Sequence, residues 1–596
     1  MTTSPAKTTV GTPVIQLPPA AARIGVLAGA VLVFAGTMMP WTWTSAYPGD
    51  LTVWGYPAEL QVVTLTGALL TLLFALSAQG LRGLGWLTPG GKNSPILLTA
   101  LGTLLTAGYA MGSIAYELGG VVNLEPGAWI SGIGALIAVI GALALPSEIA
   151  PEEAAPNPWH RLRAATRAPE PKRAAKELPG WMEILAIATA FAIGLYVLAY
   201  GIAAEAELFI GTLVTALFGA AAISRSGLLA RVNALTAKHR NVTLTAAFVA
   251  AVCFPFTQTD DTYALIGTNI LIFTTVALGL NIVVGLAGLL DLGYVAFLGV
   301  GAYAAALVSG SPQSTIGVHF PFWAALLTGA IASLIFGVLI GAPTLRLRGD
   351  YLAIVTLGFG EIFRITMNNL NGNTGPDVTN GSNGIPNIPN LEMFGFNFGE
   401  QHEILGFTLG RPSNYFLLML LVTAVVVLVF RRSGDSRIGR AWVAIREDET
   451  AATAMGINGF RVKLIAFALG ATLAGLAGTV QAHVQYSITP EQYQFANSVP
   501  PNSAFLLAAV ILGGMGTISG PLIGAALLYL IPAKLQFLGE LQLLLFGLAL
   551  VLLMRFRPEG LVANKRSQLE FHEADQPDVP EQREPENTVG ATKAGA

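Results

Sequence analysis

The chain has 596 residues, of which 11% are charged and 53% are hydrophobic, and its mean hydropathy is +0.62. A soluble domain typically carries about 25% charged residues, so this composition excludes an ordinary soluble protein. Repeated windows of about 20 apolar residues instead predict an all-α, polytopic helical membrane protein. The net charge of −3 does not discriminate among functions. The one cysteine, Cys253, excludes an intrachain disulfide and argues against a metal site.

The first 240 residues contain six predicted spans, at about 24–40, 58–79, 95–115, 128–146, 183–203 and 207–223. Residues 1–23 form a polar tail without a cleavable signal. A linker at 147–180, rich in Pro, Ala and basic residues, separates an accessory four-span region, 24–146, from the two further spans in 181–240. Basic residues flank the tail, the loop at 80–94 and the linker, which places all three in the cytoplasm.

The second half of the chain, 241–562, is predicted to form a separate membrane core. Its full-length spans are expected at about 242–257, 264–288, 291–309, 322–342, 351–369, 414–430, 463–486 and 538–554. The long polar loop at 370–412 falls outside, and a disordered tail at 563–596 falls in the cytoplasm. Successive spans must alternate in direction across the membrane. The positions of the basic residues agree with that alternation only if the apolar run 504–531 does not cross as one helix. Its Gly-rich interruption at 513–521 therefore predicts two short helices, which are tolerated only inside a helical bundle.

A charged segment, Arg431–Lys463, interrupts this apolar half. It carries seven basic residues, which place it in the cytoplasm: Arg431, Arg432, Arg437, Arg440, Arg446, Arg461 and Lys463. Its part Ala441–Met455 contains no Gly or Pro and predicts one helix, which ends at Gly456, Asn458 and Gly459. A helix tied to the membrane at both ends is either a docking handle for a partner or an ordinary solvated loop.

The sequence contains no motif for chemistry of its own. A GxxxxGK[ST] phosphate loop, an HExxH motif and a GxSxG motif are all missing. His483 is the only histidine within a predicted span, and a packed or pore-lining role is favoured over catalysis. Glu361 and Arg364, three residues apart, are expected to form an internal ion pair. No span carries the series of buried carboxylates expected of a proton-coupled pump, which weakens the case for secondary transport.

From about 265 to 561 the chain resembles the M-type permease subunit of branched-chain amino acid ATP-binding-cassette importers. The motifs that carry the resemblance occur in order over about half the chain: Gly279–Gly285 (GLNIVVG), Leu289–Phe297 (LLDLGYVAF), Gly299–Tyr303 (GVGAY), Leu345–Glu361 (LRLRGDYLAIVTLGFGE), Asn383–Ile385 (NGI), Gly439–Glu449 (GRAWVAIREDE), Met455–Ile457 (MGI), Gly475–Gly478 (GLAG), Gly513–Gly516 (GGMG) and Arg557–Leu561 (RPEGL). Such a subunit binds no cofactor and has no ATPase site. ATP is used by two cytoplasmic partner subunits, beside a second homologous permease and an extracytoplasmic solute-binding protein.

The resemblance also implies functional residues. The charged segment matches the loop that couples such permeases to their ATPases, and the residues expected to act in coupling are Arg440, Trp442, Ile445, Arg446, Glu447, Asp448, Glu449, Ala451, Ala452, Met455 and Gly456. The residues expected along the translocation path are Asn281, Gly285, Thr356, Gly513, Gly514 and Gly516. An importer of urea or short amides and an ion-coupled carrier working alone remain the alternatives. The region before residue 240 extends beyond the resemblance, and either lateral packing or docking of another membrane subunit is its expected role.

Overall fold

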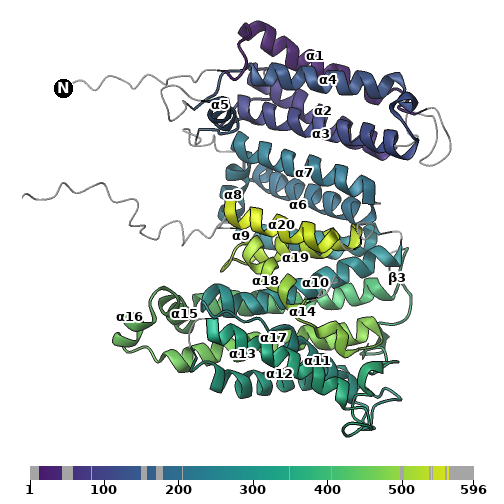
Figure 1. Ribbon diagram of the computed structural model, residues 1–596, viewed down its shortest axis with the longest axis vertical. Coiled ribbons are helices and arrows are strands. Elements are labelled where there is room, and N and C mark those ends of the chain that lie inside the picture. The colour runs from purple at the N-terminus through teal and green to yellow at the C-terminus, as the bar shows by residue number, and fades with distance from the viewer. Residues whose placement is uncertain are drawn as a thin grey trace, which may run out of the picture. The chain divides into compact units, whose positions relative to one another are not determined.

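The computed structural model describes residues 13–42, 58–81, 83–149, 157–169, 179–204, 206–258, 260–347, 350–404, 406–496, 502–535, 539, 541–556 and 560–562. They form two compact units, Met1–Gly267 with Gln401–Leu420 and Thr268–Glu400 with Leu421–Ala596. Helices dominate both units, which confirms the predicted all-α class (Figure 1). Among the described residues, ten helices are long and apolar enough to cross a membrane. The tail at 563–596, Arg557 and most of the tail at 1–23 lie outside the described residues.

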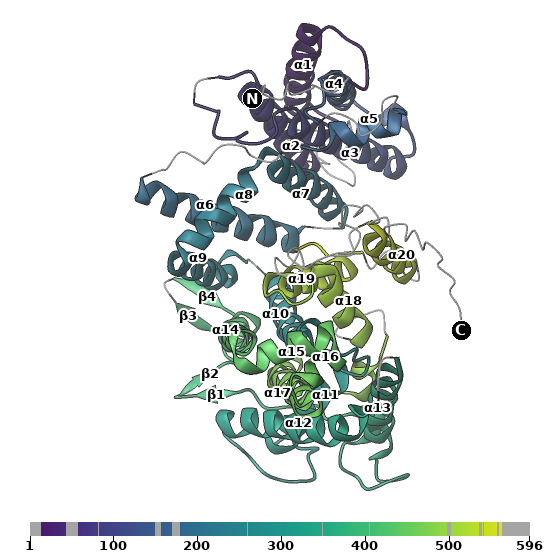
Figure 2. The same ribbon diagram turned by 90° about the vertical axis from the view of Figure 1, so that its left-hand side faces the viewer.

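The first unit contains the six spans predicted before residue 240. Its elements are α1 (Pro19–Thr37), α2 (Ala58–Ala78), α3 (Asn93–Glu117), η1 (Val121–Asn123), α4 (Pro126–Leu143), α5 (Pro158–Ala165), α6 (Gly180–Ala203), α7 (Ala206–Ser226), α8 (Leu228–Lys238), α9 (Arg240–Cys253), η2 (Phe254–Thr257), β3 (His402–Ile404) and β4 (Phe407–Leu409). The strands β3 and β4 form one antiparallel hairpin (Figure 2).

The elements that follow along the chain are α10 (Asp261–Asn281), the π-helical turn η3 (Ile282–Leu286), α11 (Val295–Val308), α12 (Phe322–Thr344), α13 (Asp350–Asn369), η4 (Gly381–Asn383), β1 (Glu392–Met393), β2 (Phe396–Asn397), α14 (Arg411–Asp435), α15 (Arg437–Glu447), α16 (Glu449–Ala454), α17 (Gly459–Gln485), η5 (Pro490–Tyr493), α18 (Ser503–Gly513), α19 (Ser519–Lys534) and α20 (Leu541–Phe556). The boundary between the two units falls inside α10 and α14.

Glycines bring α1 and α4 into close contact in the first unit. A Cβ atom at Gly29 would lie 2.6 Å from the carbonyl oxygen of Gly134, and one at Gly134 would lie 2.9 Å from the carbonyl oxygen of Gly29. Cβ atoms essentially never come so close to another heavy atom, so only glycine permits this approach. Such contacts between small residues are a principal source of helix association in a bilayer, where burial of apolar surface gives no advantage over lipid.

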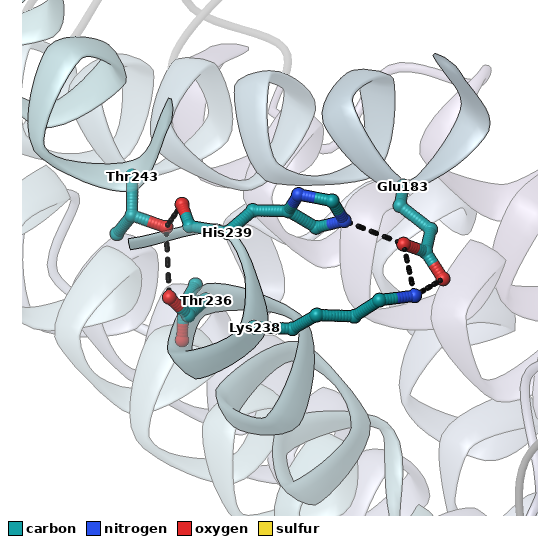
Figure 3. A network of polar contacts seen from close by, with 5 residues as sticks. All are labelled: Glu183, Thr236, Lys238, His239 and Thr243. Carbon is teal, nitrogen blue, oxygen red and sulfur yellow. Dashed lines mark hydrogen bonds and ion pairs between the residues drawn. The ribbon is translucent and has the colours of Figure 1, made fainter. Parts of the chain in front are cut away.

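A buried carboxylate holds the elbow between α8 and α9 against α6. Glu183, in the first turn of α6, is 3% exposed, and its Oε2 atom lies 2.8 Å from Lys238 Nζ and 2.6 Å from His239 Nε2 (Figure 3). Thr243 Oγ1 donates to the carbonyl oxygens of His239 and Thr236, which secures the same elbow. The basic residues that end α8 are thus fixed by a carboxylate about 55 positions earlier in the chain.

Helices α11, α12 and α17 form the tightest bundle of the second unit (Figure 1). A Cβ atom at Gly475 in α17 would lie 2.7 Å from the carbonyl oxygen of Gly329 in α12, so backbone meets backbone there. Tyr294 Oη donates to the Gly470 carbonyl at 2.6 Å, and Ser333 Oγ donates to the Phe297 carbonyl at 2.8 Å. These bonds link all three helices and satisfy polar atoms that lipid could not.

One predicted element is shorter than expected, and one unusual prediction is confirmed. The span predicted at 291–309 forms a helix only over Val295–Val308, because Asp291 and Gly293 end the apolar run before it. Its 14 residues measure about 21 Å, less than the thickness of a bilayer core. The run 504–531 is indeed broken into two short helices, α18 and α19, which pack against each other.

Candidate functional site

The charged segment begins in the last turn of α14 and folds into two short helices, α15 and α16. Ser436 caps α15, since its Oγ atom accepts a hydrogen bond from the Gly439 amide at 3.1 Å. One face of α15 is buried and carries Gly439, Trp442 and Ile445. Trp442 is 1% exposed, and its Nε1 atom donates to the Val462 carbonyl at 2.8 Å. The indole therefore fixes α15 to the first turn of α17.

The prediction of a single helix over Ala441–Met455 is wrong, because Asp448 interrupts that helix. The backbone of Asp448 is extended (φ −153°, ψ 108°), and its Oδ1 atom accepts hydrogen bonds from the amides of Thr450 at 2.7 Å and Ala451 at 3.0 Å. Asp448 is thus the N-cap of α16, a role that short polar side chains prefer over a helix interior. Asp448 and Glu449 consequently lie outside α15 and do not continue the face of Trp442 and Ile445.

A buried lysine attaches α16 to α17. Lys463 is 6% exposed, and its Nζ atom lies 2.7 Å from Oε1 of Glu449. Gly456, with φ of 86°, ends α16 in a conformation that favours glycine, and Asn458 then caps α17 by accepting from the Arg461 amide at 3.0 Å. The charged segment is therefore a fixed structure and not an ordinary solvated loop.

The eleven residues predicted to act in coupling fall into two groups. Three of them, Trp442, Ile445 and Ala452, are buried within this chain. The others lie at least partly on the surface, and Met455 is 84% exposed. Arg446 also reaches inward, since its Nη1 atom donates to the Gly285 carbonyl at 2.7 Å. That contact joins the charged segment to the end of η3.

Five of the six predicted path residues, all except Thr356, lie at or beside the break between α18 and α19. Gly514 and Gly516 have φ values of 120° and 74°, and Thr517 Oγ1 donates to the Gly514 carbonyl at 2.8 Å. The amides of Leu561 and Val562 donate to the Leu512 and Gly513 carbonyls at 2.7 and 2.9 Å. The chain beyond α20 thus supplies partners for the carbonyls that α18 leaves free at its end.

Asn281 clamps this break to the end of α10. Its Oδ1 atom accepts from the Gly516 amide at 2.8 Å, and its Nδ2 atom donates to the Thr517 carbonyl at 2.7 Å. Gly285 lies one turn later, where a Cβ atom would sit 2.6 Å from the Gly516 nitrogen. Asn281 is fully buried, so both of its polar atoms are used inside the chain.

Thr356, the remaining predicted path residue, joins α13 to the non-helical segment before α11. Its Oγ1 atom accepts from the Leu292 amide and donates to the Ala353 carbonyl, both at 3.0 Å. Asp291 is 1% exposed there, and its Oδ1 atom accepts from the Gly293 amide at 3.0 Å.

His483 is buried in α17, as the prediction of a packed or pore-lining role allows. Its Nδ1 atom lies 2.7 Å from the Thr479 carbonyl oxygen, and its Nε2 atom lies 3.0 Å from Ser309 Oγ. His483 and Ser309 also line a cavity of about 450 Å³ together with Phe320, Phe322 and residues 389–392. The histidine links α11 to α17.

The ion pair predicted between Glu361 and Arg364 is confirmed, and it continues to a third residue. Arg364 Nε lies 2.9 Å from Glu361 Oε2, and Arg364 Nη1 lies 3.1 Å from Oε1 of Glu491, in η5. Asn368 Nδ2 donates to the same Glu491 oxygen at 3.4 Å. Glu491 follows α17 by six residues, so sequence spacing gave no sign that it would meet α13.

Comparison with known proteins supplies the family. Residues 262–554 match the family model described as the permease component of branched-chain amino acid transport systems. The high-affinity branched-chain amino acid transport system permease protein LivM of Salmonella typhimurium is 38% identical over 361 residues, which cover 58% of this chain and 80% of the relative. The probable LivM of Methanocaldococcus jannaschii is 23% identical over 44% of this chain and 72% of its own length.

A shorter match extends to the LivH permease protein of Escherichia coli, which is 36% identical over 19% of this chain and 32% of the relative. No solved structure matches the chain. The LivM match covers most of the relative, and the family model covers the break, the charged segment and α13. The chain therefore belongs to the family of permease components of branched-chain amino acid transport systems.

Proposed function

We propose that this chain is the transmembrane permease subunit of an ATP-driven importer of branched-chain amino acids in the cell membrane. It receives the amino acid from an extracytoplasmic solute-binding protein and passes it to the cytoplasm. The observation that carries this proposal is the 38% identity across 80% of a permease named for that transport system. The alternation of basic residues along the chain supports a multi-pass arrangement with both termini in the cytoplasm.

The proposed division of labour leaves no chemistry to this chain. It is not an enzyme and binds no cofactor; two cytoplasmic ATPase subunits bind and hydrolyse ATP, and a second homologous permease completes the membrane part. The missing phosphate loop supports this division. The charged segment is the docking site for an ATPase subunit, and the predicted coupling residues that are exposed are Arg440, Arg446, Glu447, Asp448, Ala451, Met455 and Gly456.

The proposed path passes the break between α18 and α19. Two short helices place their facing ends inside the bundle, and such ends bind polar parts of a substrate in many transporters. Gly513, Gly514 and Gly516 form this break, while Asn281 and Gly285 hold it in position. Thr356 contributes by fixing α13 beside the non-helical segment before α11.

Uptake of radiolabelled leucine and urea tests the substrate. A strain that lacks this chain is compared with the same strain carrying the wild-type gene. The expected result is that leucine uptake requires the chain and urea uptake does not. Loss of urea uptake with intact leucine uptake would assign the chain to the urea and short-amide permeases.

Reconstitution tests the energy source. Vesicles that contain this chain alone are expected to show no uptake driven by an ion gradient. Vesicles that also contain the partner subunits, with the binding protein present and ATP supplied on the side of the ATPase subunits, are expected to accumulate leucine. Gradient-driven uptake by the chain alone, without ATP, would contradict the proposal and support an ion-coupled carrier.

A further inference from the structure

Three charged groups meet where α13 approaches η5. The Arg364 guanidinium lies between two carboxylates, with Nε 2.9 Å from Glu361 and Nη1 3.1 Å from Glu491. The side chains of Arg364, Glu361 and Glu491 are 23%, 37% and 51% exposed, so all three can be reached from the surface of the chain. The cluster holds two carboxylates and one guanidinium, and therefore carries a net charge of about −1 at neutral pH.

This cluster lies at the end of the second unit opposite to the charged segment. The charged segment ends in the first turn of α17, at Lys463, and Glu491 follows the last turn of that helix, so most of its 27 residues, about 40 Å in all, lie between the two. The segment after α17 is anchored there, because the Ile385 and Ile488 amides each donate to the other's carbonyl oxygen, at 3.0 and 3.1 Å. Under the proposed function, the cluster faces the side on which substrate arrives.

The position of Glu361 and Arg364 within α13 argues against a lipid-facing role. Glu361 lies eight residues before the end of the helix at Asn369, a depth of about 12 Å. Charged side chains at such a depth are costly in lipid and typically face a protein or a water-filled passage. The apolar side chains of Ile362 and Ile365 beside them are 64% and 50% exposed. This surface of α13 thus combines apolar area with exposed charges of both signs.

An amino acid with an aliphatic side chain matches that combination. Its α-carboxylate can replace Glu491 at the Arg364 guanidinium, which binds carboxylates through paired N–H donors. Its α-ammonium can then pair with the released Glu491 carboxylate, so that no charge is left without a partner during the exchange. The aliphatic side chain finds the apolar surface of Ile362 and Ile365.

Two tyrosine hydroxyl groups are buried where α13 packs on α11 and η5. Tyr303 and Tyr493 pack against Phe363, with ring centroids 6.1 and 6.2 Å from it, and their Oη atoms have no hydrogen-bond partner among the described residues. Buried polar atoms of this kind are usually satisfied, by water or ligand where the protein offers nothing. Phe363 adjoins Arg364 in the sequence, and Tyr493 follows Glu491 by two residues.

We propose that Arg364, Glu361 and Glu491 form a substrate-contact site in which the Arg364–Glu491 pair exchanges its partners for the carboxylate and ammonium groups of a zwitterionic aliphatic amino acid. This inference rests on the proposed function. Arg364 binds the carboxylate, Glu491 binds the ammonium group, and Glu361 holds the guanidinium in place throughout. The exchange breaks and forms only ion pairs and hydrogen bonds.

The test is the number of leucine molecules imported per ATP hydrolysed, measured with the full importer in vesicles at saturating leucine and binding protein. Arg364→Gln is expected to lower this ratio about tenfold or more, the effect of losing a charge-assisted contact, while ATP hydrolysis stimulated by the binding protein persists. Arg346→Gln, which removes the same charge from an exposed position before α13, is the control and is expected to leave the ratio unchanged.

The double variant Arg364→Gln/Glu491→Gln distinguishes contact with the substrate from a merely structural link between α13 and η5. Two glutamines can keep a hydrogen bond between α13 and η5 but offer no charge to a zwitterion. The proposal expects the ratio to stay low, and a ratio restored to the wild-type value would overturn it. Absence of leucine uptake by the wild-type importer would contradict the proposed function itself, whereas normal wild-type uptake with an unchanged ratio in Arg364→Gln contradicts only the substrate-contact site.

Discussion

Trp442 and Lys463 carry polar atoms into the interior of the second unit, and each has one specific partner there. The Trp442 indole donates to the Val462 carbonyl, and the Lys463 ammonium pairs with Glu449. Glu449 is the first residue of α16, and Val462 lies in the first turn of α17. At the residue scale, these two contacts turn a charged stretch into a fixed surface, since losing either one would leave a buried polar group without a partner.

Replacing Glu449 and replacing Lys463 are expected to change the stability of the joint between α16 and α17 differently. Glu449→Gln leaves the Lys463 ammonium, 8% exposed, without a carboxylate and is expected to destabilise the joint by about 1–3 kcal/mol. Lys463→Met removes the buried charge and keeps most of the side-chain volume, so it is expected to be neutral or slightly stabilising. Hydrogen exchange of the α16 amides measures both. Faster exchange in Lys463→Met than in Glu449→Gln would show that the ammonium has another, stronger role.

At the element scale, the charged segment offers a buried face and an exposed one, which makes the docking proposal testable. Met455→Asp changes a side chain that is 84% exposed and is expected to weaken ATPase association at least tenfold without unfolding the permease. Ala452→Asp is unsuitable, because Ala452 is 4% exposed and its replacement would disrupt packing. Co-purification of the ATPase subunits is the measurement, with Thr453→Asp as a neighbouring exposed control. Full association of the Met455→Asp variant would place docking elsewhere.

The segment from Asn281 to Gly285 touches both the break and the charged segment. Asn281 bonds to Gly516 and Thr517, while the Gly285 carbonyl accepts from Arg446. The docking surface and the broken helices are therefore attached to the same short piece of backbone, one turn apart. A displacement of α15 would act on η3 through the hydrogen bond between Arg446 and the Gly285 carbonyl.

Asn281→Leu tests the clamp. Leucine has a similar size but cannot bond the Gly516 amide or the Thr517 carbonyl, so the variant is expected to lose about 1–3 kcal/mol for each group left unsatisfied. Thermal unfolding in detergent measures the loss. Asn281→Asp keeps an acceptor for Gly516 and is expected to fall between leucine and wild type only at a pH low enough to protonate the carboxyl. A wild-type melting temperature for Asn281→Leu would mean that water replaces both bonds.

At the scale of the whole molecule, hydropathy and charge predicted most of the helices, and parity of the membrane crossings predicted the break between α18 and α19. Both features are set by the bilayer, because its thickness and its lack of hydrogen-bonding partners constrain long stretches of sequence. The interruption at Asp448 was not predicted, because a single capping side chain ends the helix within a stretch whose average composition favours a helix. The contact of Arg364 with Glu491 could not be foreseen either, since 127 positions separate them and only the fold brings them together.

The accessory region before residue 180 yields the last prediction. Helix α7 packs on α3, where Thr106 and Thr215 hydroxyls lie 3.0 Å apart and a Cβ atom at Gly102 would lie 2.7 Å from the Phe218 Cβ. A chain that begins at Gly180 keeps all residues of the family match, 262–554, but exposes that face of α7. It is therefore expected to import leucine normally within the full importer and to unfold at a lower temperature.

Co-expression of residues 1–156 as a separate chain is the control for that truncation. It is expected to restore the unfolding temperature, because the glycine contacts between α1 and α4 and the face of α3 are complete within the fragment. Uptake lost in the truncated chain and recovered on co-expression would give the accessory region a part in transport. Uptake retained throughout would limit it to packing beside α7, since the contacts that position the break, the charged segment and Arg364 all lie beyond residue 280.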